Sequence, residues 1–316
     1  MSTWRKPLLA ALLLLSAVTV VACGSSKSSS SSASSTSGSA SASTSTSTTS
    51  SSTPAADPAV VKLVPAAIKS KGTLTVAADA TYAPNEFIGP DGHTVVGMDA
   101  DLSHALASVM GLKANVVNAT FDTIIPGLAA GKYDMGASSF TDTKAREKVV
   151  DFVDYFSAGT SFFTKSSGGV SVTGLADLCG KSVSVESGTT QEADAKGQSV
   201  KCKAAGKPAV NVLVFPTQTA ANLALSSGRA QLSMADSPVA DYQVKQSNGT
   251  FKLIGQSYGT APYGLALPKS ANTAPAVLAA LKVLESDGTY MSILSKWGIQ
   301  GGAIPASEMK INGATG

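Results

Sequence analysis

Short apolar runs and amphipathic stretches alternate along the first half of the chain. Residues 74–78 form an apolar run that predicts a strand, and Asp101–Met110 places apolar side chains at helical spacing just before Gly111. A Gly-Pro-Asp-Gly turn at 89–92 predicts a hairpin between them. The other elements predicted in this half are a strand at 114–117, a helix at 122–130 and a strand at 134–137. Strands and helices that alternate in this order are typical of a largely parallel sheet.

A second alternation of the same kind follows. Its predicted strands are 183–185, 210–215, 232–235 and 251–254, and its predicted helices are 191–196, 220–227 and 239–246. A strand at 264–267 and a helix at 276–297 remain, too short to form a unit alone, so we expect them to pack on the first unit. The sequence therefore predicts an α/β protein of two lobes, with lobe 1 at 67–162 and 260–316 and lobe 2 at 163–259. The chain would cross between the lobes near Phe162–Lys165 and Gln256–Pro262.

The N-terminal segment has the pattern of a secretory signal. Two basic residues precede Leu8–Val21, a run of 14 residues of which only two are polar. This run is shorter than the ~20 apolar residues of a membrane-spanning helix, so we expect residues 1–22 to be cleaved as a signal peptide. The ending Val20-Val21-Ala22-Cys23 resembles a bacterial lipobox, which implies that Cys23 becomes the first residue and carries lipid. An ordinary signal peptide cut near Ala22 is the alternative.

A tract of low complexity separates the signal from the predicted lobes. In residues 25–53, 24 of 29 positions are Ser or Thr, a composition that cannot form a core. We predict that residues 23–66 comprise the lipidated cysteine and a disordered linker. Two cysteines remain, Cys179 and Cys202, and in an oxidising compartment we expect them to be bonded. Their separation excludes a CxxC zinc or redox motif.

Charge and residue types exclude several functional classes. The formal charge is +3, from 24 basic and 21 acidic side chains, and it falls to +1 once the two basic residues of the leader are removed. This balance gives no support to nucleic-acid binding. His93 and His104 lack a ligand-spaced partner, and Asp99 and Asp101 stand where carboxylates serve a helix start more often than calcium. We therefore expect neither a metal nor a cofactor.

Several motifs occur in an order that resembles one family. They are Asp79-Ala80-Thr81-Tyr82-Ala83-Pro84-Asn85-Glu86-Phe87, Gly97-Met98-Asp99-Ala100-Asp101, Ser138-Ser139-Phe140-Thr141 with Arg146, Ser187-Gly188-Thr189-Thr190, Ala235-Asp236 and Lys296-Trp297-Gly298. Over about residues 72–298 the chain resembles the family 3 solute-binding proteins of amino-acid ABC transporters. The resemblance implies a periplasmic-binding-protein-like fold, in which two α/β lobes joined by a hinge of two crossing strands close on one free amino acid.

The same resemblance implies the binding residues. Arg146, which we expect about one turn into a helix capped by Asp142 or Thr143, would hold the α-carboxylate of the ligand with its guanidinium fork. Asp236 would accept hydrogen bonds from the α-ammonium. Tyr82 and Phe121 would enclose the ligand's side chain. The other residues expected to contact the ligand are Asp79, Ser138, Ser139, Thr141, Gly188, Thr189 and Thr190. Residues 188–190 follow a strand and open a helix, so their free N–H groups would form an anion site.

Each of these residues also has a purely structural alternative. Arg146 could form a surface salt bridge with Glu147 or Asp151, and Asp236 could cap the helix after Pro238. Thr141 and residues 188–190 could belong to turns and caps that bind nothing. Tyr82 and Phe121 could be ordinary core residues.

Two acidic residues bear on specificity. Asp79 matches the side-chain end of the family's pocket, and Glu186 stands where some glutamine binders carry lysine. If both point into the cleft, they favour a cationic or amide side chain and oppose glutamate and aspartate. Asn85 replaces an aromatic residue that is usual in the family, which leaves the shape of this end open.

These features together predict an extracytoplasmic protein, anchored to the cell membrane by lipid on Cys23. We expect a monomer that captures a polar amino acid and delivers it to an ABC permease. The first alternative is an enzyme on the same fold, similar to cyclohexadienyl dehydratase, which would need a general acid such as Glu186 or Asp79. The second alternative is a ligand-sensing signalling receptor.

Overall fold

The structure is a computed structural model that describes residues 54–314. The signal peptide predicted for residues 1–22, the lipid site at Cys23 and the Ser/Thr tract up to residue 53 lie outside the described residues.

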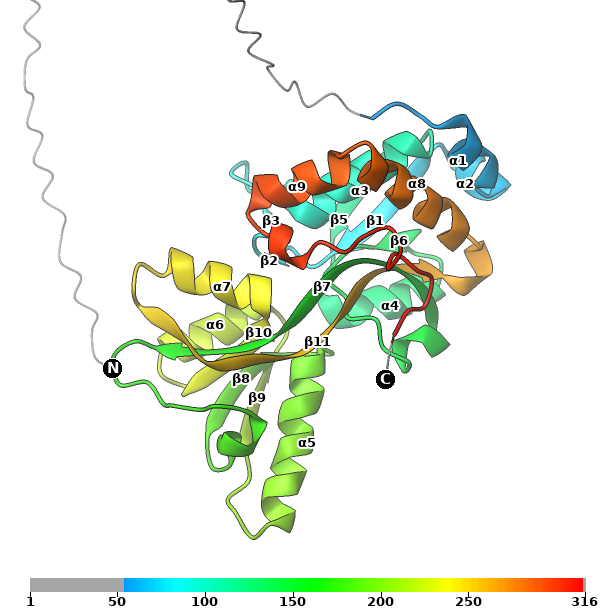
Figure 1. The fold of residues 1–316 in the computed structure, drawn as a ribbon. Helices are drawn as coiled ribbons and strands as arrows, with labels where there is room; N and C mark the ends of the chain where they lie inside the picture. The colour runs from blue at the N-terminus through cyan, green and yellow to red at the C-terminus, as the bar shows by residue number, and fades with distance from the viewer. Residues whose placement is uncertain (1–53, 315–316) are drawn as a thin grey trace, which may run out of the picture. The chain divides into compact units, whose positions relative to one another are not determined.

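One eight-stranded sheet runs through the described part of the chain (Figure 1), in the order β5-β1-β6-β11-β7-β10-β8-β9. Its strands are β1 (Thr73–Ala78), β5 (Lys113–Asn118), β6 (Met135–Gly136), β7 (Val150–Lys165), β8 (Ser182–Glu186), β9 (Asn211–Phe215), β10 (Leu232–Asp236) and β11 (Phe251–Pro268). At one end β5, β1 and β6 are parallel, and at the other end β10, β8 and β9 are parallel. These two groups of strands are the two alternations predicted from the sequence.

Two long antiparallel strands, β7 and β11, join the two groups (Figure 1). Val150 pairs with Pro268 at one extreme and Lys165 pairs with Phe251 at the other. The register shifts between Ile254 and Ala261, close to where the chain is expected to cross. The predicted fold of two α/β lobes with a hinge of two crossing strands is confirmed. The lobe boundaries at 162/163 and 259/260 stay a prediction, because both strands run on across them.

Helices pack on both groups of strands. The first half contains α1 (Pro58–Leu63), α2 (Ala66–Lys71), α3 (Met98–Val109), α4 (Phe121–Ala129), α8 (Ala274–Ser286) and α9 (Thr289–Trp297), and the second contains α5 (Thr190–Ala204), α6 (Gln218–Ser226) and α7 (Ser237–Gln246). Short 3₁₀ turns are η1 (Arg146–Lys148), η2 (Leu175–Leu178), η3 (Lys269–Ala271) and η4 (Gln300–Gly302). Among the described residues, no helix is long and apolar enough to span a membrane.

The predicted hairpin and the predicted amphipathic helix are both present. Strands β2 (Thr81–Tyr82), β3 (Glu86–Ile88) and β4 (Val95–Val96) form a small antiparallel sheet, with the turn at 89–92 between β3 and β4. In α3, Leu102, Leu106 and Val109 are fully buried in the larger core with Leu74 and Val76 of β1. Each such side chain contributes about 1.5–3 kcal/mol by leaving water, which fixes the helix on the sheet.

Two helix predictions are wrong. The single helix expected over 276–297 is divided into α8 and α9, because the chain turns at Asp287-Gly288 and Gly288 takes a left-handed φ of 83°. Arg146 does not lie one turn into an α-helix; it begins the 3₁₀ turn η1. The α-helix is absent there because β7 begins only two residues after the last residue of η1, which leaves no room for a full turn.

The predicted linker ends earlier than expected. Residues 58–63 fall within the predicted disordered linker, but they form α1. The carboxylate of Asp57 accepts hydrogen bonds from the N–H groups of Ala59 and Val60, and Pro58 occupies the first turn. Val60 is buried in the core against the first half of the sheet. The linker prediction is therefore wrong for this stretch.

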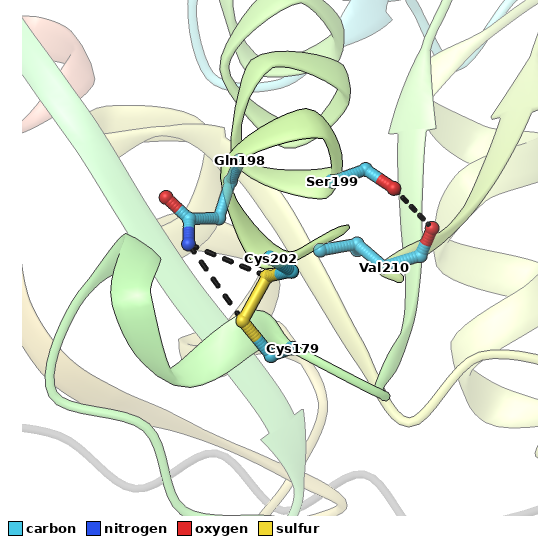
Figure 2. Close-up of a disulfide and its surroundings, with 5 residues drawn as sticks. All are labelled: Cys179, Gln198, Ser199, Cys202 and Val210. Carbon is cyan, nitrogen blue, oxygen red and sulfur yellow. Dashed lines mark hydrogen bonds between the residues drawn. A yellow bond between two sulfur atoms is a disulfide. The ribbon is translucent and has the colours of Figure 1, made fainter. Parts of the chain in front are cut away.

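The predicted disulfide is present, and Figure 2 shows it between Cys179, which follows η2, and Cys202 in α5. The side-chain amide of Gln198 donates to both sulfur atoms, at 3.8 Å to Cys179 and 3.4 Å to Cys202. Ser199 donates to the carbonyl of Val210 at 3.0 Å. By closing a loop of this length in the unfolded chain, the bond stabilises the second half by about 3 kcal/mol.

Candidate functional site

A small pocket lies between residues of the two halves. Ser139 follows β6 and Asp236 ends β10, so the pocket lies beyond the carboxyl ends of strands, where open α/β sheets bind ligands. Its lining residues are Tyr82, Phe121, Ser139, Thr141, Arg146, Thr189, Thr190, Gln191, Gln218, Ala235 and Asp236.

Arg146 is fixed by contacts to both halves. One terminal nitrogen, Nη1, donates to the carbonyl of Thr141 at 2.8 Å, and the other, Nη2, donates to the carbonyl of Gly188 at 2.9 Å. The guanidinium also lies 5.4 Å from the ring centre of Phe121 and 5.5 Å from that of Phe140. Burial lowers the pKa of Arg146, but a guanidinium stays charged at any ordinary pH.

The salt bridges proposed as the alternative role for Arg146 are made by other residues. Glu147 pairs with Lys144 at 3.0 Å, and Asp151 pairs with Lys269 at 2.5 Å. The nearest opposite charge that acts on Arg146 is Asp236, across the pocket. Arg146 is therefore a positive charge that faces the pocket.

Asp236 supplies the negative charge of the pocket. Its Oδ1 accepts a hydrogen bond of 2.7 Å from the side-chain amide of Gln191, which also donates to Thr160 at 2.8 Å. Burial raises the pKa of Asp236 to about 6, although Tyr263, Gln191 and Arg146 favour the charged form. Asp236 occupies the N-cap position of α7 but makes no side-chain capping bond there. Its carboxylate thus faces the pocket in its ionised form at neutral pH.

The Gly188-Thr190 segment caps α5 and lines the pocket. Thr189 is the N-cap, and its hydroxyl accepts from the N–H of Glu192 at 3.1 Å. The N–H of Gly188, expected to be free for an anion, donates instead to the Glu192 carboxylate at 2.7 Å. Gly188 has a φ of 76°, and a side chain there would come within 2.9 Å of Asp122 in the other half. The close approach of the two halves at this point requires glycine.

A buried hydrogen-bond network holds the pocket residue Ser139 from behind. Its N–H donates to Asp99 at 2.9 Å, and its hydroxyl donates to Glu86 and accepts from the side chain of Asn85. Asp99 also accepts from Tyr155 at 2.6 Å. The pKa of Glu86 is raised well above its ordinary value by burial and by Asp99, so this pair of carboxyls shares a proton. Asp99 is therefore neither a simple helix cap nor a calcium ligand.

The aromatic walls of the pocket are Tyr82 and Phe121. Their ring centres are 5.7 Å apart in an edge-to-face arrangement, and Phe121 stacks on Phe140 at 4.5 Å. Both residues are also part of the second core cluster. The structural and the binding interpretations of these two residues are thus compatible.

Two buried carboxyls, Asp79 and Glu186, lie next to Tyr82, and neither of them lines the pocket. Asp79 is satisfied, because its oxygens accept from the hydroxyl of Thr81 at 2.7 Å and from the N–H of Phe121 at 2.9 Å. Glu186, the last residue of β8, is only 1% exposed, and neither of its oxygens makes a hydrogen bond of good geometry to the described residues. Asp79 and the Tyr82 hydroxyl lie beside it, and burial together with Asp79 raises the pKa of Glu186 to about 9.

The family model of the bacterial extracellular solute-binding proteins, family 3, matches residues 74–300. The chain belongs to this family. The match includes the pocket and both long strands, and it leaves out α1, α2 and the last described residues. The family 3 assignment predicted from the order of motifs is thus confirmed.

Relatives of this family 3 protein include binding proteins for two amino acids. The arginine-binding protein ArgT of Corynebacterium glutamicum is 35% identical over 248 residues, which are 78% of this chain and 81% of ArgT. The glutamine-binding protein GlnH of Bacillus subtilis is 32% identical over 214 residues, which are 66% of this chain and 74% of GlnH.

Solved structures of amino-acid-binding proteins are also similar to this chain. An ancestral arginine-binding protein bound to arginine is 37% identical, with a TM-score of 0.66, and covers 72% of this chain and 98% of its own. The ancestral amino acid-binding protein AncCDT-1, a precursor of cyclohexadienyl dehydratase, is 34% identical, with a TM-score of 0.65, and covers 73% of this chain and 97% of its own.

The pocket of the family 3 protein brings together most of the residues expected to bind. Tyr82, Phe121, Ser139, Thr141, Arg146, Thr189, Thr190 and Asp236 all line it. Ser138 does not: it is fully buried behind the pocket, where it accepts from the N–H of Asp79. Asp79 and Gly188 are adjacent to the lining without belonging to it. The ligand-binding role of each residue stays a prediction.

Sequence reasoning missed two pocket residues, Gln191 and Gln218. Gln218 begins α6 just beyond the end of β9, and its N–H donates to Thr81 of the other half at 3.2 Å. Both glutamines stand at helix starts that follow parallel strands, which is the signal that would have found them. Among the described residues, no cluster of His, Cys, Asp and Glu is arranged to hold a metal ion.

Proposed function

We propose that this protein binds a free L-amino acid with a cationic side chain, arginine first, and delivers it to an ABC permease. The observation that carries the proposal is Glu186, a buried carboxyl whose oxygens make no hydrogen bond of good geometry to the described residues, beside the second buried carboxyl Asp79. A guanidinium carries five N–H donors in a planar fork, so it matches both the charge and the missing hydrogen bonds of this end.

The opposite end fits the part that all α-amino acids share. Arg146 and Asp236 present one positive and one negative charge to the same pocket, which complements a carboxylate and an ammonium group. Tyr82 and Phe121 line the pocket, and Tyr82 adjoins Glu186, so in this proposal the two rings would contact the aliphatic stem of the ligand. The names of the relatives, which include arginine binders, agree with this reading of the charges.

The site of action in this proposal is outside the cytoplasm. The lipobox-like ending would place lipid on Cys23, and residues 24–53 would tether the folded part to the membrane as a monomer. Delivery to a permease is proposed because the chain belongs to the extracellular solute-binding proteins, family 3. Intact-mass analysis of protein extracted from membranes tests the anchor, and an unmodified N-terminus upstream of Cys23 would contradict it.

A thermal-shift screen against the twenty amino acids tests the ligand. A ligand at 100 times its dissociation constant stabilises the folded state by ~2.7 kcal/mol, which gives a clear shift in Tm. We expect the largest shift with L-arginine, a smaller one with L-lysine, and none with L-glutamate or L-aspartate. A larger shift with an acidic amino acid than with arginine would overturn the assignment.

A second candidate function is a dehydratase on the same fold. It is favoured by the raised pKa of Glu186, about 9, because a carboxylic acid that stays protonated at neutral pH could act as a general acid. The likeness to a precursor of cyclohexadienyl dehydratase agrees with it. Turnover of prephenate or arogenate would support the enzyme, and tight arginine binding without turnover supports transport.

A further inference from the structure

Residues 304–314, here called the strap, lie outside the segment that the family model matches and run along β7. The N–H of Asp154 donates to the carbonyl of Lys310 at 2.9 Å, and the N–H of Asn312 donates to the carbonyl of Phe152 at 3.0 Å. Ile311 pairs with Val153 in an antiparallel bridge. The strap, red in Figure 1, therefore covers an edge of β7 that β11 leaves free.

The end of the strap meets three acidic side chains. The N–H of Ala314 donates to Asp142 at 3.1 Å and to Glu147 at 3.3 Å, and the N–H of Gly313 faces Asp154. Asp142 and Asp154 are 3% and 2% exposed, and Oδ1 of each has no donor among the described residues. Their carboxyls lie close enough for a hydrogen bond once one of them holds a proton. We call Asp142, Glu147 and Asp154 the acid cluster.

The acid cluster stands directly behind the loop that carries the pocket's arginine. Asp142 follows Thr141, whose carbonyl accepts from Arg146, and Glu147 follows Arg146 itself. The N–H of Arg146 donates to the hydroxyl of Thr143 within the same loop. Two of the three acids thus belong to the loop, and the third, Asp154, belongs to β7. Whatever fixes the cluster also fixes the loop to β7.

We propose that the strap is a positioning element for Arg146: its terminal N–H groups hold the acid cluster, and the cluster holds the loop 141–147 in the geometry that presents the guanidinium to the pocket. This inference rests on the proposed function, because Arg146 positions a ligand carboxylate only if the pocket binds one. Residues that support a binding group from behind commonly decide how accurately it is placed.

The charges around the cluster explain why the strap is needed. Lys144 pairs with Glu147, and Lys269 pairs with Asp151 next to the cluster, while Arg146 attracts Asp142 from the pocket side. Asp154 takes part in none of the ion pairs among the described residues, and burial and Asp142 raise its pKa to about 8. The pair Asp142–Asp154 therefore keeps one proton at neutral pH and loses it at higher pH, when two adjacent charges would repel.

One substitution separates the strap from the cluster. In Gly313→Ala the new Cβ would overlap Oδ2 of Asp154, so either the strap end or the Asp154 carboxyl must move and their contact is lost. Gly301→Ala is the matched control, because a Cβ there meets no atom within 4 Å and Gly301 precedes the strap. We expect Gly313→Ala to weaken L-arginine binding about tenfold in calorimetry, and Gly301→Ala to stay within about twofold of the wild type.

Hydrogen exchange of the ligand-free protein gives a readout that does not depend on the ligand. Amides of residues 141–149 should exchange faster in Gly313→Ala, while amides of β8 and β9 stay as in the wild type. If the wild type binds no amino acid, the proposed function fails and the exchange result still tests the link from strap to loop. Unchanged exchange in 141–149, or faster exchange there with unchanged affinity, would overturn the positioning role.

A conservative pair of variants separates positioning from mere packing. In Asp154→Asn the side-chain amide can donate a hydrogen bond to Asp142 at any pH, whereas Asp154→Ala has no side-chain donor. We expect Asp154→Ala to bind arginine about tenfold more weakly and Asp154→Asn to bind as the wild type at pH 7. Between pH 7 and 9 the ratio of wild-type to Asp154→Asn affinity should fall, because only the wild-type pair loses its proton. Equal affinities for all three proteins at both pH values would contradict the proposal.

Discussion

The two ends of the pocket differ in how their charges are satisfied. At one end Arg146 has two carbonyl acceptors and Asp236 has the amide of Gln191. Next to Tyr82, at what the proposal takes as the other end, Glu186 makes no hydrogen bond of good geometry to the described residues and stands beside another acid. A satisfied end costs little to maintain without ligand and recognises groups that every α-amino acid carries. An unsatisfied end destabilises the ligand-free protein, and it selects the ligand whose side chain supplies what is missing.

Loss of Arg146 should have the largest effect, because it removes the charge partner of a ligand carboxylate buried in the pocket. Leaving such a charge unpaired costs ~3 to 5 kcal/mol. Arg146→Ala should therefore raise the dissociation constant for L-arginine by about two to three decades, and Arg146→Lys should recover little because an ammonium lacks the fork. Calorimetry on the folded variants measures both affinities. If Arg146→Ala binds L-arginine within threefold of the wild type, Arg146 does not bind the ligand's carboxylate.

Glu186→Gln should weaken the binding of cationic ligands only. Glu186 must lose its proton to pair with a guanidinium, so wild-type affinity for arginine should rise with pH from 6 to 8, by at most about tenfold per pH unit. The variant should bind arginine about tenfold more weakly at pH 8 and show no such slope. Glutamine binding should change little. Glu285→Gln, on α8, is the control, and an equal loss for arginine and glutamine would contradict the division between the two ends.

The same substitution should stabilise the ligand-free protein. The pKa of Glu186 is raised from 4.5 in the unfolded chain to about 9 in the folded one, so this group destabilises the fold increasingly as pH rises from 4.5 to 9. A neutral amide avoids that cost and can donate to Asp79, and we expect a gain of about 1 kcal/mol at pH 7. Urea unfolding measures it, and a loss of stability would show that Glu186 is satisfied in a way the structure does not show.

Asp236→Asn should weaken binding about as much as Glu186→Gln does, but without distinguishing between ligands. The amide oxygen can still accept one hydrogen bond from an α-ammonium, but the charge attraction is lost, so we expect about tenfold weaker binding. The loss should be the same for arginine and for glutamine, since both carry the same α-ammonium. A loss confined to arginine would place its guanidinium, rather than its ammonium, at Asp236.

Much of the fold was predictable because its signals are local. The apolar spacing of α3, the turn before β4 and the alternation of strands with helices each depend on a few neighbouring residues. The length of β7 was not, because the run Val150–Lys165 mixes apolar residues with Asp151, Asp154 and Ser157 and has no clear period. Its extent is set by pairing with β11, a hundred residues away in the chain.

The binding site was likewise predictable only in part. Arg146, Asp236 and the two aromatic walls follow from motifs in the right order, and the structure brings them to one pocket. The state of Glu186 could not be predicted, because a glutamate that ends a strand gives no sign of whether a donor will reach it. The strap was missed as well, since it forms only one isolated bridge, at Ile311, and becomes informative only where it meets Asp142 and Asp154.

The most direct test of the account counts the protons released when arginine binds. Calorimetry of L-arginine and of L-citrulline, whose urea group is a neutral analogue of the guanidinium, should be run at pH 7 in two buffers of different ionisation enthalpy. Because the pKa of Glu186 is about 9 without ligand, pairing it with a guanidinium should release about one proton per arginine bound. Citrulline should release almost none. Equal proton release for the two ligands, or none for arginine, would contradict the claim that Glu186 receives the cationic side chain.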